Sequence, residues 1–88
     1  MKTLSPEQLL AIADEFAQAT SAHVQSFSAL VACASIPGAR VHGVPVFDSV
    51  EDAAGALAGA VEKLQPLSAS NEMFGQVAAE VYRRWAEA

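Results

Sequence analysis

The sequence predicts an all-α fold in which two long helices form an antiparallel hairpin, and three observations lead to this prediction. The 88 residues make one helical domain, 1–88, and 52% of them are hydrophobic, with the strong helix former Ala as the commonest type. One break, rich in Pro and Gly, divides the chain near its middle. After the break, apolar residues recur at seven-residue steps, which is a helical period and not a strand period. Two such rows run to the C-terminus: Val50, Leu57, Leu64, Asn71, Ala78 and Trp85, and beside it Ala53, Ala60, Leu67, Phe74 and Val81.

The first helix is expected over residues 6–34. Ser5 precedes Pro6, which suits the first helical position, and Gln8 completes a capping box with Ser5. Apolar side chains then follow at spacings of three and four, which defines one face of a helix. They are Leu9, Ile12, Phe16, Ala19, Phe27, Leu30 and Val31, with His23 among them. We expect Pro37–Gly38 to end this helix.

Residues 35–48 are predicted to form a loop that connects the two helices. Four residues in it exclude a regular helix: Pro37, Gly38, Gly43 and Pro45. Several apolar side chains indicate that the loop packs against the helices. Residues 44–47 suit a short extended segment, but the sequence shows no strand to pair with it, so no sheet is expected.

The second helix is expected over residues 49–87, with a kink near Pro66. Two pairs of residues are suited to begin it: Ser49 with Asp52, and Asp48 with Glu51. A proline inside a helix removes a hydrogen bond and costs roughly 3 kcal/mol. Because the heptad register is the same on both sides of Pro66, a kinked continuous helix explains the pattern most simply. The alternative is a three-helix bundle with a full break, in which the third helix is capped by Ser68, Ser70 or Asn71.

The predicted helices differ in length, which draws attention to the C-terminal end. At 1.5 Å per residue, the first helix spans roughly 43 Å and the second roughly 57 Å. In a hairpin, the second helix would extend about two turns beyond the first. The extension contains Tyr82, Arg83, Arg84 and Trp85. Aromatic and Arg side chains on a protruding end are typical of a recognition element. Alternatively, Tyr82 and Trp85 fold back onto the N-terminal end of the first helix.

A second group of residues indicates that the chain associates. Phe16 and Phe27 are eleven residues apart, which is three helical turns, and Val24 and Val31 widen the same face. A two-helix hairpin buries only one stripe of each helix, so we expect a homodimer or a complex with a similar hairpin. The predicted partner-binding residues are therefore Phe16, Val24, Phe27, Val31, Tyr82, Arg83, Arg84 and Trp85.

Composition and motifs argue against several other classes of function. The net charge of −5 and the absence of a basic stripe argue against nucleic-acid binding. No apolar run is long enough to span a membrane, and the first residues carry no secretory signal peptide. The sequence contains no nucleotide-binding fingerprint, and its two His and one Cys are too scattered for a zinc site. We therefore expect no cofactor, metal or small-molecule ligand.

The isolated His and Cys residues have structural interpretations. His23 lies on the apolar face of the first helix, where a packed histidine is expected. Cys33 and His42 form a conceivable nucleophile pair across the loop, but no orienting group or oxyanion motif accompanies them. A structural cysteine at a buried helix end is the favoured interpretation.

Three stretches resemble the EspC-like branch of small proteins associated with type VII (ESX) secretion: LLAIADEFAQATSAHV, IPGARVHG and QVAAEVYRRWAEA. In that family the tail carries a Tyr-x-x-x-Asp/Glu export signal. Tyr82 matches its tyrosine, whereas Ala86 stands four residues on and the acidic Glu87 follows one position later. The resemblance implies a helical hairpin that is exported without a leader peptide.

We therefore expect a non-enzymatic helical interaction protein of the type VII secreted or secretion-associated kind, which acts through a homo- or heterodimeric helical interface. Its location would be outside the cell, by a leaderless route, or the cytoplasm. One alternative is an intracellular adaptor, antitoxin, immunity protein or small subunit of a complex. A second alternative is a small enzyme subunit that uses Cys33 and His42.

Overall fold

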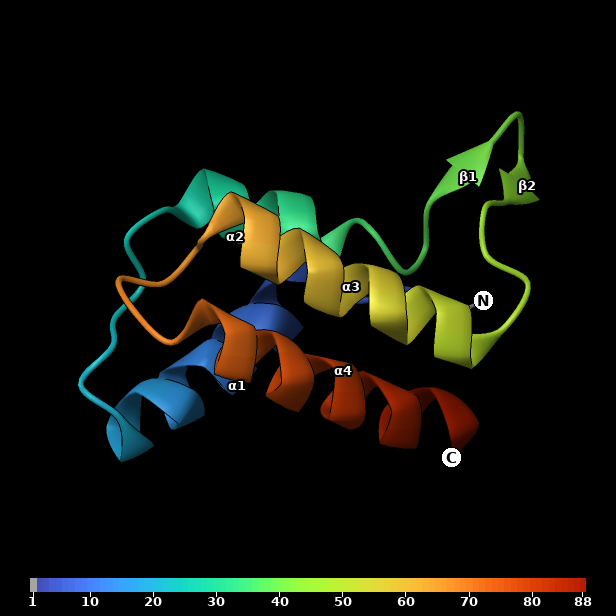
Figure 1. Cartoon of the computed structure of the whole chain (residues 1–88). Coiled ribbons are helices and arrows are strands. Elements are labelled where there is room, and N and C mark those ends of the chain that lie inside the picture. Colours follow the sequence, from blue (N-terminus) through green and yellow to red (C-terminus); the bar gives the residue numbers. More distant parts are fainter. Residues whose placement is uncertain (1) are drawn as a thin grey trace.

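The computed structural model describes residues 2–88, and most of them are helical (Figure 1). Residues 2–88 contain four helices, which are α1 (Pro6–Ala19), α2 (Phe27–Ala34), α3 (Val50–Leu64) and α4 (Asn71–Glu87). A short hairpin pairs β1 (Arg40–Val41) with β2 (Val44–Pro45). The mostly helical class predicted from the sequence is confirmed. The hairpin of two long helices is not what the structure shows, because each predicted helix is interrupted.

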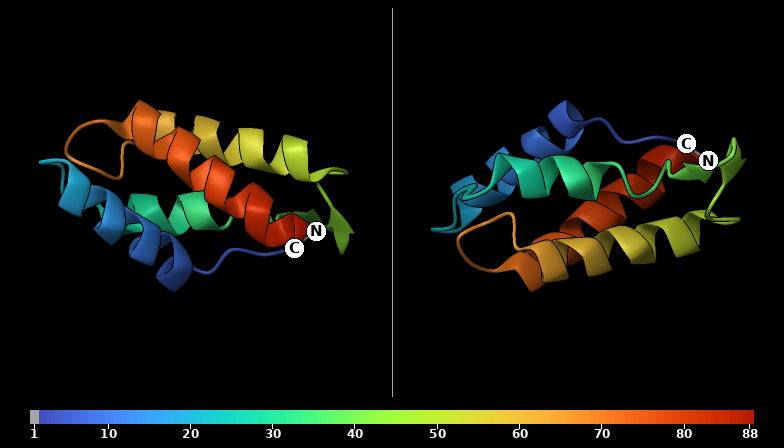
Figure 2. Two further views of the ribbon diagram at one scale, coloured as in Figure 1. Left: turned by 90° about the horizontal axis from the view of Figure 1, so that it is seen from below. Right: turned by 90° about the horizontal axis from the view of Figure 1, so that it is seen from above.

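The four helices alternate in direction along the chain and pack around one core. Figure 2 shows α4 lying between α1 and α3 on one face, and α2 lying between the same two helices on the opposite face. The packed pairs agree with this view: α3 with α4, α2 with α3, α1 with α2 and α1 with α4. Helices α2 and α4 are therefore on opposite sides of the molecule.

The predicted helix over residues 6–34 is interrupted at residues 20–26, so α1 and α2 stand in place of one long helix. Its beginning is as expected, since Ser5 and Gln8 form the capping box, with N···O distances of 3.0 and 2.8 Å. At its end, the Thr20 hydroxyl donates to the Phe16 carbonyl and the backbone becomes extended. A new helix begins after Ser26, whose side chain accepts a hydrogen bond from the Ala29 N–H. Thr20 and Ser26 stand at the two ends of this interruption, and their hydroxyl groups compete with the backbone for helical hydrogen bonds. These two residues indicate the interruption in the sequence, although the spacing of the apolar residues favours a continuous helix.

The interruption at residues 20–26 exists because this segment pairs with residues 65–70. The N–H groups of Gln25 and Ser26 both donate to the Pro66 carbonyl, at 2.9 and 3.2 Å. The Ser68 N–H donates to the His23 carbonyl at 2.8 Å, and the Ser68 hydroxyl accepts from the His23 N–H. Two connections that are about 40 residues apart in sequence thus satisfy each other's backbone groups at one end of the bundle.

The kink predicted at Pro66 is also wrong, because the chain breaks there and reverses direction. Helix α3 ends at Leu64, and Gln65 takes a left-handed conformation with φ 54°. Helix α4 begins after Ser70, which is left-handed as well, with φ 59°. The alternative of a full break is therefore the correct one at this position, although four helices result and not three. The shared heptad register does not reflect a continuous helix.

The connection over residues 35–48 is mainly loop, as predicted, but it contains the β1–β2 hairpin. The expectation that residues 44–47 have no strand to pair with is wrong, because Val44 pairs with Val41 and Pro45 with Arg40. The turn between the strands has positive φ at His42 and Gly43, as a tight two-residue hairpin turn requires.

The core lies where all four helices meet. Its aromatic centre is the contact of Phe16 in α1 with Phe74 in α4, whose ring centroids are 5.5 Å apart. Helices α3 and α4 approach closely at Gly75, where an added Cβ would lie 3.0 Å from the carbonyl oxygen of Ala58. The other buried side chains come from every helix and include Leu9, Leu30, Leu57, Val61, Leu67 and Tyr82.

Candidate interaction surface

Tyr82 is part of the core and not of a protruding tail. Its side chain has 0% exposure, and its hydroxyl donates to the Lys2 carbonyl at 2.7 Å. The longest dimension of the molecule is 38 Å, less than the length predicted for either long helix. The predicted extension therefore does not exist, because the break near Pro66 shortens the last helix to residues 71–87. The alternative, in which Tyr82 packs against the N-terminal part of the chain, is what the structure shows.

Trp85 lies at the surface where the two ends of the described chain meet. The Lys2 ammonium group lies 4.9 Å from the Trp85 ring centroid and donates to the Trp85 carbonyl at 3.0 Å. The Trp85 ring also packs against Tyr82, with centroids 6.1 Å apart. About a third of the Trp85 residue, 36%, remains exposed. Trp85 is thus held in place by its neighbours while one side of it stays accessible.

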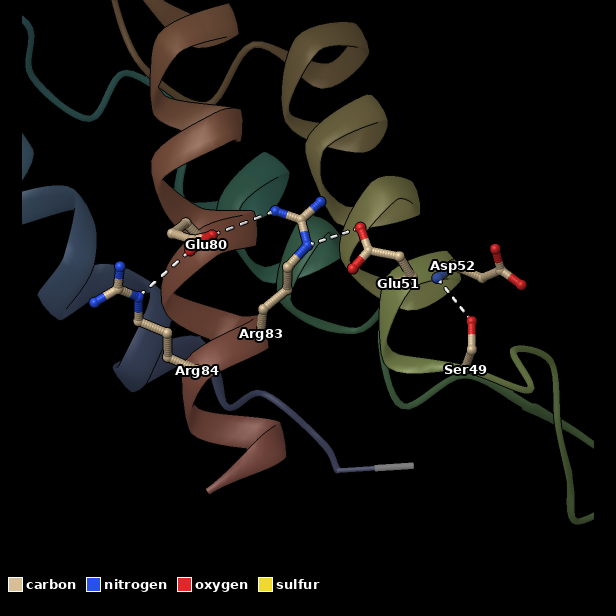
Figure 3. A network of polar contacts seen from close by, with 6 residues as sticks. All are labelled: Ser49, Glu51, Asp52, Glu80, Arg83 and Arg84. Atoms are coloured by element: carbon tan, nitrogen blue, oxygen red, sulfur yellow. Dashed lines mark hydrogen bonds and ion pairs between the residues drawn. The ribbon is translucent and has the colours of Figure 1, made fainter.

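The two arginines of the predicted recognition element have different surroundings (Figure 3). Arg83 reaches across to α3, where its Nε lies 3.0 Å from the Glu51 carboxylate, and it also contacts Glu80 at 3.6 Å. Arg84 pairs with Glu80 of its own helix at 3.4 Å, and its side chain is 82% exposed. Arg83 therefore joins two helices within the chain, whereas Arg84 is available to a partner.

The other four predicted partner-binding residues do not form one face. Phe16 is buried against Phe74, and Val24 is partly buried in the bridge to Leu67. Phe27 and Val31 are exposed, at 63% and 49%, and lie one turn apart on α2. The shared face required a continuous helix from Phe16 to Phe27, and the break at residues 20–26 separates them.

The structure reveals an exposed apolar ridge on α4 that the seven-residue rows did not single out. The ridge consists of Met73, Val77, Val81 and Trp85, which are 36–59% exposed. Residues four apart follow one another along a helix surface, so these four side chains form a continuous row. The spacing is present in the sequence. Only the burial of the opposite side of α4 shows that the row faces outward.

A groove runs between this ridge and α1. It has two adjoining hollows of about 400 Å³ and 240 Å³, which share Ala11, Ile12 and Val81 in their walls. The first hollow also contacts Glu15, Phe16 and Val77, and the second Leu4, Gln8, Tyr82 and Trp85. Its walls are predominantly apolar, and it is open to solvent along its length. Such a groove is suited to receive the apolar side of a helix.

The candidate catalytic and ligating residues lie apart from this groove. Cys33 in α2 is completely buried, and burial raises the pKa of its thiol from 9.0 to about 11, so the thiol is protonated at neutral pH. His42 is exposed in the hairpin turn. His23, predicted to be packed, is also exposed, because it lies in the extended segment between α1 and α2. Among residues 2–88, no three His, Cys, Asp or Glu side chains gather as a metal ion would require.

The buried Cys33 makes stability dependent on alkaline pH. Because the thiol ionises near pH 9.0 when unfolded and near 11 when folded, the unfolded chain loses its proton first. This contribution to stability is complete below pH 9 and decreases by about 1.4 kcal/mol per pH unit between the two pKa values. Urea denaturation between pH 8.5 and 10.5 measures the slope. Burial also raises the pKa of Tyr82, so the comparison is with Cys33→Ala, in which the thiol's share of the slope is removed. An equal slope in the two proteins would contradict this prediction.

Comparison with protein-family models, curated proteins and solved structures finds no match to this chain. No helix within residues 2–88 is long and apolar enough to cross a membrane.

Proposed function

We propose that this chain is a non-enzymatic helical interaction protein that binds a partner through the groove between α1 and α4. The observation that carries the proposal is the ridge of four apolar side chains beside a groove with apolar walls. A contiguous apolar surface of this kind on a small domain is typical of a protein-binding site.

The ridge is also held in a defined shape before any partner binds. The opposite side of α4 is buried through Phe74, Ala78 and Tyr82, so the helix cannot rotate without exposing core side chains. Trp85 is further fixed by Tyr82 and Lys2. A preorganised surface loses less conformational entropy when a partner docks, which favours binding.

The sequence resemblance extends this proposal to type VII secretion, with an intracellular adaptor as the alternative use of the same groove. The surroundings of Tyr82 bear on whether the chain is exported, because Tyr82 matches the tyrosine of the export signal. Tyr82 is buried, and its hydroxyl donates a hydrogen bond to the Lys2 carbonyl. A secretion component could therefore bind the Tyr82 side chain only if the last turns of α4 unfold. The rival enzyme role for Cys33 is disfavoured because its thiol is buried and protonated.

The test compares two surface variants of the tagged protein, Val81→Asp in the ridge and Phe27→Asp on α2. Because a charge in the groove wall must be desolvated when a partner docks, Val81→Asp is expected to weaken binding by at least tenfold. Partners are captured from cells, identified by mass spectrometry, and titrated as purified proteins. Circular dichroism verifies that both variants stay folded.

Phe27→Asp is the matched control, because it places the same charge on an exposed apolar site on the opposite side of the molecule. It is expected to bind as the unmodified chain does. If Phe27→Asp abolishes binding and Val81→Asp does not, α2 is the binding surface and the groove is not. Export of the same variants from cells with a type VII system tests the secretion part separately.

A further inference from the structure

We propose that the partner in the groove is a second copy of this chain, related to the first by a twofold axis that makes the two α4 helices antiparallel. This inference rests on the proposed function, since it names the occupant of the same groove. In the dimer, the ridge of each copy lies in the groove of the other.

The first argument is shape. Ridge and groove lie side by side on one face and share Val77, Val81 and Trp85. A surface that carries a row and an adjacent groove of the same length is complementary to itself after a half-turn, which is the requirement for a closed dimer. Rows of residues four apart are also the ridges that interdigitate in the commonest class of helix packing.

The second argument is the identity of the side chains that this half-turn brings together. An axis at the middle of the ridge, between Val77 and Val81, places Val77 of each copy beside Val81 of the other. It also places Met73 at one end of the ridge beside Trp85 of the second copy. Contacts between a thioether and an aromatic ring are favourable. The contact also covers Met73, which is the most exposed side chain of the ridge.

The third argument is charge. The groove has an acidic end, where Glu15 lines the hollow with Val77, and a basic end, where the ammonium group of Lys2 lies over Trp85. Antiparallel copies bring the Lys2 end of one groove to the Glu15 end of the other, twice in each dimer. A parallel arrangement places like charges together, so electrostatics favours the antiparallel one.

The oligomeric state tests the inference directly. Light scattering on the purified chain at micromolar concentration is expected to give twice the monomer mass of 9.2 kDa. Val81→Asp is expected to give the monomer mass, and Phe27→Asp, on the opposite face, to stay dimeric. A monomeric unmodified chain, or a dimer that Phe27→Asp but not Val81→Asp dissociates, would overturn the inference.

Charge reversal tests the antiparallel arrangement. Lys2→Glu and Glu15→Lys are each expected to raise the dissociation constant of the dimer by about threefold to tenfold, because each creates two like-charged pairs. The double variant restores opposite charges at both places and is expected to bind more tightly than either single variant. It stays below the affinity of the unmodified chain, because the contact of Lys2 with Trp85 is lost. Additive weakening in the double variant would overturn the antiparallel arrangement. Since both changes are on the surface, circular dichroism is expected to show the same helix content in all three proteins.

The outcome also separates this inference from the proposed function. A monomeric chain that captures a different protein in a Val81-dependent way overturns the second copy as the occupant, whereas the interaction function stands. A monomeric chain with no Val81-dependent partner overturns both.

Discussion

Replacing Tyr82 by Ala is expected to lower the free energy of unfolding by about 3–5 kcal/mol, the range for removal of a large buried aromatic side chain. The Tyr82 ring is fully buried at the junction of α4 with the N-terminal segment. An 88-residue domain has a total stability of only about 5–15 kcal/mol. The variant is therefore expected to be largely unfolded on mild heating, which thermal and urea denaturation followed by circular dichroism will measure.

Two further variants show how much of the stability lost in Tyr82→Ala comes from the hydrogen bond and how it compares with loss of the neighbouring Trp85. Tyr82→Phe removes only the hydrogen bond to the Lys2 carbonyl and is expected to cost about 0.5–1.5 kcal/mol. Trp85→Ala removes a side chain that is still 36% exposed, so its cost is expected to be smaller than that of Tyr82→Ala. If Tyr82→Ala leaves stability unchanged and instead weakens partner binding, the tyrosine belongs to the binding surface and not to the core.

Asn71→Leu is expected to cost about 2–4 kcal/mol, because it leaves two buried backbone groups without hydrogen bonds. The Asn71 side chain accepts from the Leu67 N–H and donates to the Leu67 carbonyl, both at 2.9 Å. Asn71 and Leu67 are both buried, so water cannot replace these bonds. The turn that reverses the chain between α3 and α4 therefore depends on one amide side chain. Urea denaturation measures the loss.

Asn71→Asp provides the control for this second prediction. An ionised carboxylate still accepts from the Leu67 N–H, but it faces the Leu67 carbonyl with a negative charge and without a donor. Protonation restores a donor, so the destabilisation is expected to be larger at pH 7 than at pH 4. An Asn71→Asp variant with the same loss at both values would show that the donated hydrogen bond contributes little.

The sequence alone was sufficient for features that depend on neighbouring residues. The capping box of Ser5 with Gln8 forms as expected. Of the two pairs suited to begin the second helix, Ser49 with Asp52 is the one that forms, and the Ser49 hydroxyl accepts from the Asp52 N–H at 3.1 Å. Each involves residues three positions apart, whose geometry follows once a helix begins. Helical periodicity likewise predicted the mostly helical class.

The breaks in the two predicted helices were decided by contacts between distant residues. Local spacing favoured helix across residues 20–26, and the heptad register favoured helix across Pro66. In the structure these two segments pair through the Pro66, His23 and Ser68 hydrogen bonds. Neither segment indicates its partner by itself, so the pairing could not be read from either pattern.

The candidate interaction surface was likewise predicted in part by the sequence and decided in part by the tertiary structure. The spacing of Met73, Val77, Val81 and Trp85 is visible in the sequence, as is the aromatic character of the C-terminal end. Only the tertiary structure determined that Tyr82 is buried while its neighbours on the ridge are exposed. The physical reason is that periodicity defines which residues share a side of a helix, whereas the packing of α1 and α3 against α4 determines which side is covered.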